Sequence, residues 1–253
     1  MSNRGNVVTE LMALSHHLGE EWLEYVIVGE GNVSARVDDE TFVVKASGTN
    51  LRTIDEHGFV HLRLKPLLEL LNSSPTDSDV ARALNDAKID ASVSARPSME
   101  TFLHVVALAE AGAKFVAHTH PVAVNAILCS QNAEALMRHI YPDAITVCGP
   151  NPVFVPYHDP GVPLARAVRD ALQKNITANG EFPLVIYLQN HGVFALGQTA
   201  KQVENIAAMA VKNADVMART FALGGPRYLT EHDVARIHTR PDEELRRKKF
   251  QGG

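Results

Sequence analysis

The chain has 253 residues, of which 45% are hydrophobic, and a formal net charge of −5. This length fits one large α/β domain better than two small ones, so we expect a single domain over residues 1–240, followed by a charged tail at 241–253. An acidic balance leaves no basic surplus to neutralise a phosphate backbone, which disfavours nucleic-acid binding but leaves room for a local anion pocket.

Composition also bears on the compartment. The first 19 residues soon become amphipathic and lack the apolar run of a secretory signal. No segment approaches the roughly 18 unbroken apolar residues of a membrane helix, so we expect no membrane partner. The two cysteines, Cys129 and Cys148, have no metal-like spacing. These features predict a cytoplasmic protein with buried, reduced thiols.

The first third of the chain predicts a helix followed by a sheet. Leu11, Leu14 and Leu18 recur at helical spacing, and the segment 26–45 contains β-branched runs that predict two strands. Asp38 and the residue after it predict the turn between these strands. A further strand is expected over 59–62, and helices over 65–71 and 79–88.

The remainder alternates between helical and β-branched patterns. We expect a helix over 98–112 with Ser98 as its cap, a strand over 113–120 and a helix after Pro121. The runs ITVC, VFVPY, PLVIYLQN and GVFALG then alternate with LARAVRDALQK and a long helix near 199–223. This order predicts layered α/β architecture, and the charged last stretch is expected to be solvated.

Three histidines are candidates for metal ligands. Side chains two residues apart on a strand project to the same face, so His118 and His120 can direct two imidazoles to one point. A catalytic zinc site normally has three protein ligands, and His191 lies in QNHGV, where a strand ends and Gly192 permits a tight turn. The pair alone would also fit a structural role.

Other polar residues have both a functional and an ordinary interpretation. Glu100 is expected in the first turn of a helix, where a carboxylate commonly stabilises the helix end, but it would be a general base if it faced the metal. Small polar groups in turns or at helix starts can bind an anion or simply shape the chain. The anion-binding candidates are Asn32, Ser47, Gly48 and Ser98.

Five ordered motifs make the sequence similar to the class II aldolase/adducin family, which includes fuculose phosphate aldolase and ribulose phosphate 4-epimerase. These motifs are GNVSAR at 31–36, KASGTNL at 45–51, RPSMETFLH at 96–104, AHTHPVAV at 117–124 and QNHGVFALG at 189–197. The resemblance implies a three-layer α/β/α fold with a mainly antiparallel central sheet. It also implies a homotetramer with active sites at subunit interfaces.

The resemblance assigns roles to individual residues. It implies that His118, His120 and His191 bind Zn²⁺, or another divalent transition metal, and that Glu100 is the acid/base residue. It places Asn32, Ser47, Gly48 and Ser98 in a phosphate pocket, and Tyr228 is the positional match for a tyrosine that a neighbouring subunit contributes as an acid.

One departure from the family pattern concerns the anion. Phosphate-binding aldolases usually have two serines before the glutamate, whereas Met99 follows Ser98 in this chain. Lys45 would supply compensating charge, or would only decorate a strand edge, so the bound anion is either phosphate or carboxylate.

These observations predict a zinc-dependent lyase that performs aldol or retro-aldol chemistry on a sugar phosphate or related hydroxy-keto acid through an enediolate. Glutamate at position 100, where the epimerase branch has aspartate, favours the aldolase reaction. A sugar-phosphate epimerase, a dehydratase or a sugar-acid decarboxylase would use the same metal site. The rival of a different class is a non-catalytic, adducin-like scaffold.

Overall fold

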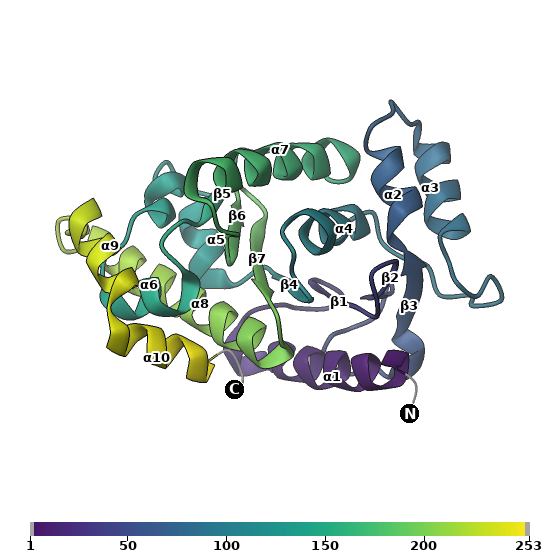
Figure 1. Ribbon diagram of the computed structural model, residues 1–253, viewed down its shortest axis with the longest axis horizontal. Helices are drawn as coiled ribbons and strands as arrows, with labels where there is room; N and C mark the ends of the chain where they lie inside the picture. Colours follow the sequence, from purple (N-terminus) through teal and green to yellow (C-terminus); the bar gives the residue numbers. More distant parts are fainter. Residues whose placement is uncertain (1–2, 251–253) are drawn as a thin grey trace.

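The computed structural model describes residues 3–250, which form one central sheet covered by helices on both faces (Figure 1). The strands are β1 (Asn32–Arg36), β2 (Thr41–Lys45), β3 (Phe59–Arg63), β4 (Phe115–Thr119), β5 (Val153–Val155), β6 (Val185–Leu188) and β7 (Gly192–Gly197). The helices are α1 (Asn3–Leu18), α2 (Leu64–Leu70), α3 (Asp77–Asp86), α4 (Thr101–Glu110), α5 (Val122–Leu128), α6 (Pro142–Cys148), α7 (Val162–Asn179), α8 (Ala200–Phe221), α9 (Glu231–Thr239) and α10 (Pro241–Phe250). Short 3-10 turns are η1 (Glu21–Leu23), η2 (Glu56–Gly58) and η3 (Ala133–Met137).

The sheet has the strand order β3-β2-β1-β4-β7-β6-β5. All neighbouring strands pair antiparallel except β5 and β6, which are parallel. The turn between β1 and β2 forms as expected, because the Asp38 carboxylate accepts hydrogen bonds from the backbone N–H groups of Glu40 and Thr41 at 2.9 and 2.7 Å. In the centre, Asn32 stands opposite His118, and His118 stands opposite Phe194.

Two apolar cores separate the sheet from its helical layers. Helices α4 and α7, with α2 and α3 beside them, cover one face (Figure 1), and residues such as Phe102, Val116 and Phe194 fill the space between. Helices α1 and α8 cover the other face, where Leu11 and Ile206 lie in the core. The structure thus confirms the three-layer α/β/α fold with a mainly antiparallel sheet.

Two segments differ from the sequence-based expectation. The ITVC run, which is rich in β-branched residues, lies in helix α6, because Pro142 at the helix start and the burial of Ile145 on this helix favour the helix over a strand. The charged stretch after residue 240 is mostly exposed, as expected, but it forms helix α10, which extends to Phe250. Its Glu243 is buried, accepts a hydrogen bond from Thr146 on α6 and pairs with Arg246.

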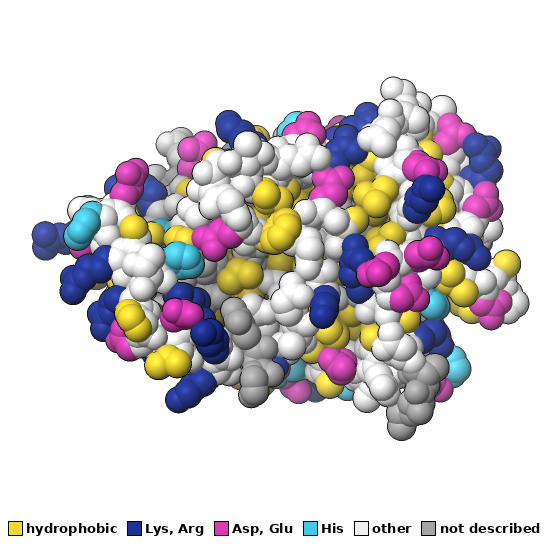
Figure 2. Space-filling view, in the orientation of Figure 1, with side chains coloured by type: hydrophobic (Ala, Val, Ile, Leu, Met, Phe, Trp, Pro, Cys, Tyr) yellow, Lys and Arg dark blue, Asp and Glu magenta, His cyan; other side chains and the backbone are white. Residues whose placement is uncertain are grey.

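On the face in Figure 2, basic and acidic side chains are interspersed. Among the described residues, no helix combines the length and the apolar character needed to cross a bilayer.

Candidate metal and substrate site

His118 and His120 lie where the central strand β4 ends. His118 is the fourth residue of β4 and is fully buried, while His120 follows the strand directly. The His118 ring stacks on Phe194 of the neighbouring strand, with ring centroids 4.2 Å apart, and its Nδ1 lies 3.1 Å from the carbonyl oxygen of Val193. These contacts hold the ring so that Nε2 faces His120 and His191.

His191 reaches the same point from the turn between β6 and β7. Its carbonyl oxygen accepts a hydrogen bond from the Asn125 side chain at 3.0 Å. The tight turn does not need Gly192 for its backbone conformation, because the residue with a positive φ is Asn190, at 57°. Gly192 is needed because other atoms lie too close to its Cα for a side chain to fit. A Cβ at position 192 would lie 2.5 Å from the Thr119 carbonyl oxygen and 2.6 Å from His120 Cδ2. Gly192 therefore allows the two strand ends to meet.

Glu100 completes a tight group of possible ligand atoms. It is the N-cap residue of α4, one position before the helix in which we expected it. Glu100 Oε1 lies 3.0 Å from His191 Nε2 and 3.6 Å from His118 Nε2. His118 Nε2 lies 2.9 Å from His120 Nε2 and 3.3 Å from His191 Nε2, and the four ligand atoms all lie within 4.8 Å of one another.

The electrostatics of this group suit a cation. Burial acts to raise the pKa of Glu100, but the charge of His118 and hydrogen bonds from His118 and His191 outweigh it and hold that pKa well below its usual range. Burial, with the charges of His118 and His191, lowers the pKa of His120 to about 3. At neutral pH the group therefore combines an ionised carboxylate with a neutral His120 imidazole, the protonation states that bind metals.

The distances also fit a divalent ion. Zinc binds imidazole nitrogen at roughly 2.0–2.1 Å, which places tetrahedral ligand nitrogens about 3.4 Å apart. The His118–His191 nitrogen separation of 3.3 Å agrees with this value, and the His118–His120 separation is somewhat shorter. Three imidazole nitrogens that converge in this way are poorly satisfied by hydrogen bonds to one another, so a metal suits them better.

The predicted anion-binding residues fall into two groups. Asn32, on β1, is buried and donates from its side-chain amide to Glu100 Oε2, while its Oδ1 has no hydrogen-bond partner. The Ser98 hydroxyl is also buried without a partner. The prediction that Ser98 caps the helix was wrong, because the helix begins at Thr101 and Glu100 occupies the N-cap position. By contrast, Ser47 and Gly48 are exposed in the loop after β2.

Lys45 connects these two groups. An isolated bridge between Ala46 and Pro97, with a hydrogen bond from Ser47 N to Arg96 O at 2.8 Å, brings the end of β2 beside the segment that precedes Glu100. Lys45 is only 1% exposed, which rules out decoration of a strand edge. Its Nζ donates to the carbonyl oxygen of Gly29 at 3.2 Å, and burial lowers its pKa while the negative charge of Glu100 raises it.

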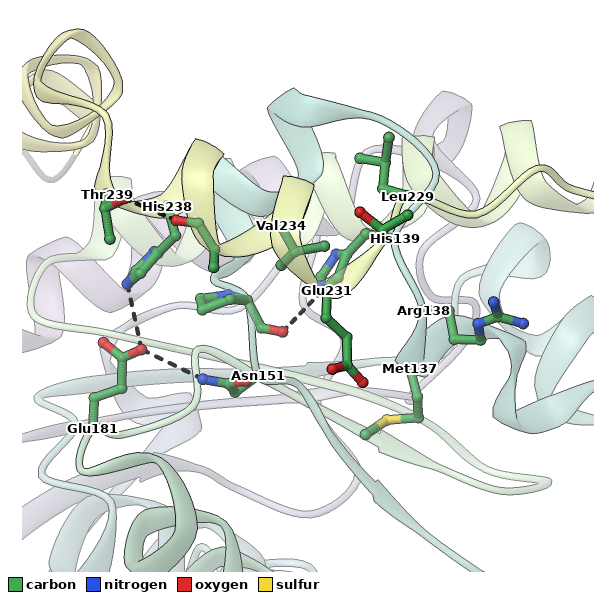
Figure 3. A pocket seen from close by; sticks show the side chains of 13 residues that line it. Met137, Arg138, His139, Asn151, Glu181, Leu229, Glu231, Val234, His238 and Thr239 are labelled. Carbon is green, nitrogen blue, oxygen red and sulfur yellow. Dashed lines mark hydrogen bonds and ion pairs between the residues drawn. The ribbon is translucent and has the colours of Figure 1, made fainter.

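Tyr228 belongs to another part of the chain. It lies between α8 and α9, with the Arg138 guanidinium 3.6 Å from its ring centroid. Arg138 lines a pocket of about 620 Å³ beside α9 (Figure 3), whose other polar residues include Glu181, paired with His238 at 3.4 Å. Tyr228 also packs against the core on the α1 and α8 side of the sheet, and none of its contacts among the described residues joins it to the four clustered residues.

The sequence did not point to two residues near the cluster, the partly exposed Glu30 and the fully buried His104. Glu30 Oε1 lies 3.7 Å from His120 Nδ1, and its position in a loop carries no periodic signal. His104 is fully buried on α4, with Nδ1 2.7 Å from the Ser34 hydroxyl.

The fold and the histidine–glutamate cluster define a protein of the class II aldolase type. Residues 9–218 match the family described as the class II aldolase and adducin N-terminal domain. The chain therefore belongs to this family, as its motifs predicted, and class II aldolases are metal-dependent.

Individual relatives support the same grouping. The uncharacterized oxidoreductase YuxG of Bacillus subtilis (strain 168) is 28% identical over 214 residues, and the match covers 79% of this chain but only 29% of YuxG. The N-terminal class II aldolase domain of a conserved protein from Thermoplasma acidophilum is 27% identical, with a TM-score of 0.68 over 84% of this chain and 93% of that one. An L-fuculose 1-phosphate aldolase is 17% identical and shares the fold, with a TM-score of 0.69 over 95% and 96% of the two chains.

Proposed function

We propose that the protein is a zinc-dependent lyase that cleaves or forms a carbon–carbon bond in a sugar phosphate or related hydroxy-keto acid by aldol chemistry. The observation that carries the proposal is the convergence of three histidine nitrogens and one carboxylate within 4.8 Å at the end of the central sheet. In the proposal, His118, His120 and His191 hold the ion. A bound divalent ion supplies Lewis-acid polarisation of a carbonyl and stabilises negative charge that develops on oxygen.

Glu100 is the proton-transfer group in this scheme. Its carboxylate is ionised at neutral pH, and Asn32 holds Oε2 while Oε1 faces the histidine nitrogens. An ionised carboxylate in this position can take a proton from a substrate hydroxyl or return one to the carbon of the enediolate that forms when the bond breaks.

The anion of the substrate is assigned to the region between Lys45 and Ser98. The proposal rests here on a buried ammonium group at Lys45 and an unpartnered hydroxyl at Ser98, with the backbone of the 47–48 turn beside them. Met99 brings no hydroxyl to this region, which favours a carboxylate over a phosphate and keeps sugar acids among the substrates to be tested. Tyr228 would act only from a neighbouring subunit of a homotetramer.

The test of the acid/base role is Glu100→Gln. This variant should bind one zinc per chain, since the three histidines remain, and should lose turnover by about 10²–10⁴-fold, the usual contribution of a positioned acid or base. The matched control is Glu110→Gln, at the other end of the same helix, where the Glu110 carboxylate accepts a hydrogen bond from the Gln173 side chain. Unchanged turnover in Glu100→Gln would refute the role, and loss of zinc would make Glu100 a fourth ligand instead.

A panel of sugar phosphates and sugar acids, offered to zinc-loaded protein, identifies the reaction. Aldehyde and ketone release would indicate retro-aldol cleavage, whereas carbon dioxide release or a stereoisomeric product would indicate decarboxylation or epimerisation. A scaffold without enzymatic activity should contain no stoichiometric zinc and should gain no stability from it. Metal analysis of the purified protein therefore separates the enzyme from the scaffold.

A further inference from the structure

The loop at residues 24–31 is fastened to the segment that carries His120. The backbone N–H of His120 donates to the carbonyl oxygen of Tyr25 at 2.9 Å, and the N–H of Val122 donates to that of Glu24 at 3.2 Å. The two hydrogen bonds are made by the first and the last residue of the His120–Val122 segment. The loop and the metal-ligand segment therefore keep a fixed position relative to each other.

The far side of the loop is held by the segment that follows β2. Lys45 Nζ donates to Gly29 O at 3.2 Å, and the Asn50 side chain donates to Val28 O. Val28 has a φ of 53°, in the left-handed region that a β-branched residue rarely adopts, and its side chain is 81% exposed. Burial does not explain this strained backbone, so the surrounding hydrogen bonds maintain it.

Three consecutive residues at the junction of the loop and β1, Glu30 to Asn32, lie against the cluster. Gly31 has a φ of 72°, and a Cβ there would lie 2.9 Å from the carbonyl oxygen of His118. The backbone therefore passes directly against the metal-ligand strand. On either side of Gly31, Asn32 donates to Glu100 and Glu30 approaches His120.

The Glu30 carboxylate is held in place by a hydrogen bond from the backbone of its own loop. Its Oε2 accepts a hydrogen bond from the backbone N–H of Ile27 at 3.0 Å, which leaves Oε1 3.7 Å from His120 Nδ1. His120 Nε2 is turned toward His118 Nε2, so Nδ1 is the nitrogen on the opposite edge of the ring.

A histidine that binds a metal through one nitrogen usually donates its other N–H to a carbonyl or carboxylate, which fixes its tautomer and orientation. Val193 O has this position for His118. We infer that Glu30 is the positioning residue of His120: its carboxylate, 3.7 Å from Nδ1 in this structure, moves about half an ångström closer to accept the Nδ1–H and so presents Nε2 to the metal. This inference rests on the proposed function, because it presupposes a metal at the cluster.

The experiment compares three variants of the full chain by their zinc affinity, measured in competition with a chromophoric chelator. Glu30→Ala should bind zinc about 10–100-fold more weakly, the usual effect of losing such a partner. Glu30→Gln should also bind zinc more weakly than the wild type but lose less than Glu30→Ala, because its single amide oxygen can accept from His120 or from the Ile27 N–H but not from both at once. Glu24→Gln, which removes the same charge from an exposed side chain of the same loop, should match the wild type.

A second readout reports the ligand geometry without any turnover. Cobalt(II) bound in place of zinc should show altered visible absorption in Glu30→Ala and unchanged absorption in Glu24→Gln. Thermal unfolding of the metal-free variants checks that they fold. If Glu30→Ala does not fold, the comparison of Glu30→Gln with Glu24→Gln decides, and equal affinities in that pair would overturn the inference.

The outcomes separate this inference from the proposed function. Wild-type protein that binds no zinc would refute the proposed function itself. Zinc binding by the wild type with an unchanged affinity in Glu30→Ala would overturn the positioning role alone. Equal losses in Glu30→Ala and Glu30→Gln would also overturn it, because they would show an effect of charge rather than of hydrogen bonding.

Discussion

Replacing His104 by asparagine should make the stability of the metal-free protein less sensitive to acid. His104 is fully buried on α4, its Nδ1 contacts the Ser34 hydroxyl, and its Nε2 has no hydrogen-bond partner. Burial, together with the charge of His118, lowers the pKa of His104 to about 3. The folded protein therefore keeps this ring neutral over a pH range in which an exposed histidine would be protonated.

The magnitude follows from proton linkage. In the unfolded chain the ring has its ordinary pKa of 6.5, so between pH 6.5 and 3 only the unfolded state takes up this proton. The stabilising contribution is complete above pH 6.5 and is lost as the pH falls toward 3. Each pH unit in this window is worth about 1.4 kcal/mol, so lowering the pH from 7.5 to 5 costs about 2 kcal/mol through His104.

Urea unfolding at pH 7.5 and pH 5, in the presence of a chelator, measures this effect. His104→Asn keeps a polar group near the Ser34 hydroxyl but cannot titrate, so its free energy of unfolding should fall by about 2 kcal/mol less than that of the wild type. His120, whose pKa is also lowered to about 3, contributes equally to both proteins. Equal pH dependence in the two proteins would show that His104 does not remain neutral.

Two further predictions concern close packing and thiol burial. Gly192→Ala should weaken zinc binding and lower the free energy of unfolding by about 1–3 kcal/mol, because the new Cβ would press on the Thr119 carbonyl oxygen and the His120 ring. Zinc titration and urea unfolding measure these two effects. A variant with wild-type zinc affinity would contradict the prediction. The prediction that both thiols are buried was wrong for Cys129, which is exposed, whereas Cys148 is buried and burial raises its pKa to about 12. A maleimide should therefore add once to the native protein and twice in urea. Mass spectrometry counts the adducts, and two additions to the native protein would be the contrary result.

The sequence predicted the fold where local patterns and tertiary packing agree. Alternation on strands and turn chemistry made His118 and His191 candidates, and the family motifs assigned them as ligands. In the structure these residues lie at the ends of neighbouring strands, β4 and β7. Motif order supplied the family, which neither composition nor periodicity could supply.

Predictions failed where tertiary contacts override local preference. The ITVC run has high β propensity, yet α6 packs against α8 and α10, and burial outweighs a propensity difference of a few tenths of a kcal/mol per residue. The C-terminal helix had a readable signal, since Pro241 is followed by acidic residues and the last turn is basic, but only the structure shows that Glu243 becomes buried against α6.

The candidate site shows the same limit. Glu30 approaches His120 only because residues 24–25 bond to residues 120–122, a contact across almost 100 positions that no local pattern reports. Likewise, Lys45 is buried and its Nζ donates to the carbonyl oxygen of Gly29, which lies in a different segment and gives no signal of this contact in the sequence.

The separation of the cluster residues along the chain has a consequence for the order of folding. His118 and His120 are local neighbours, but His191 comes 71 residues after His120, and α5, α6, β5, α7 and β6 all lie between them. A nascent chain that has not yet formed β7 beside β4 holds only part of the group, so full chelating strength arises late, with the closing of long-range strand pairs. If the cluster holds the proposed ion, metal capture is therefore tied to completion of the central sheet, and partly synthesised chains would have little means of sequestering it.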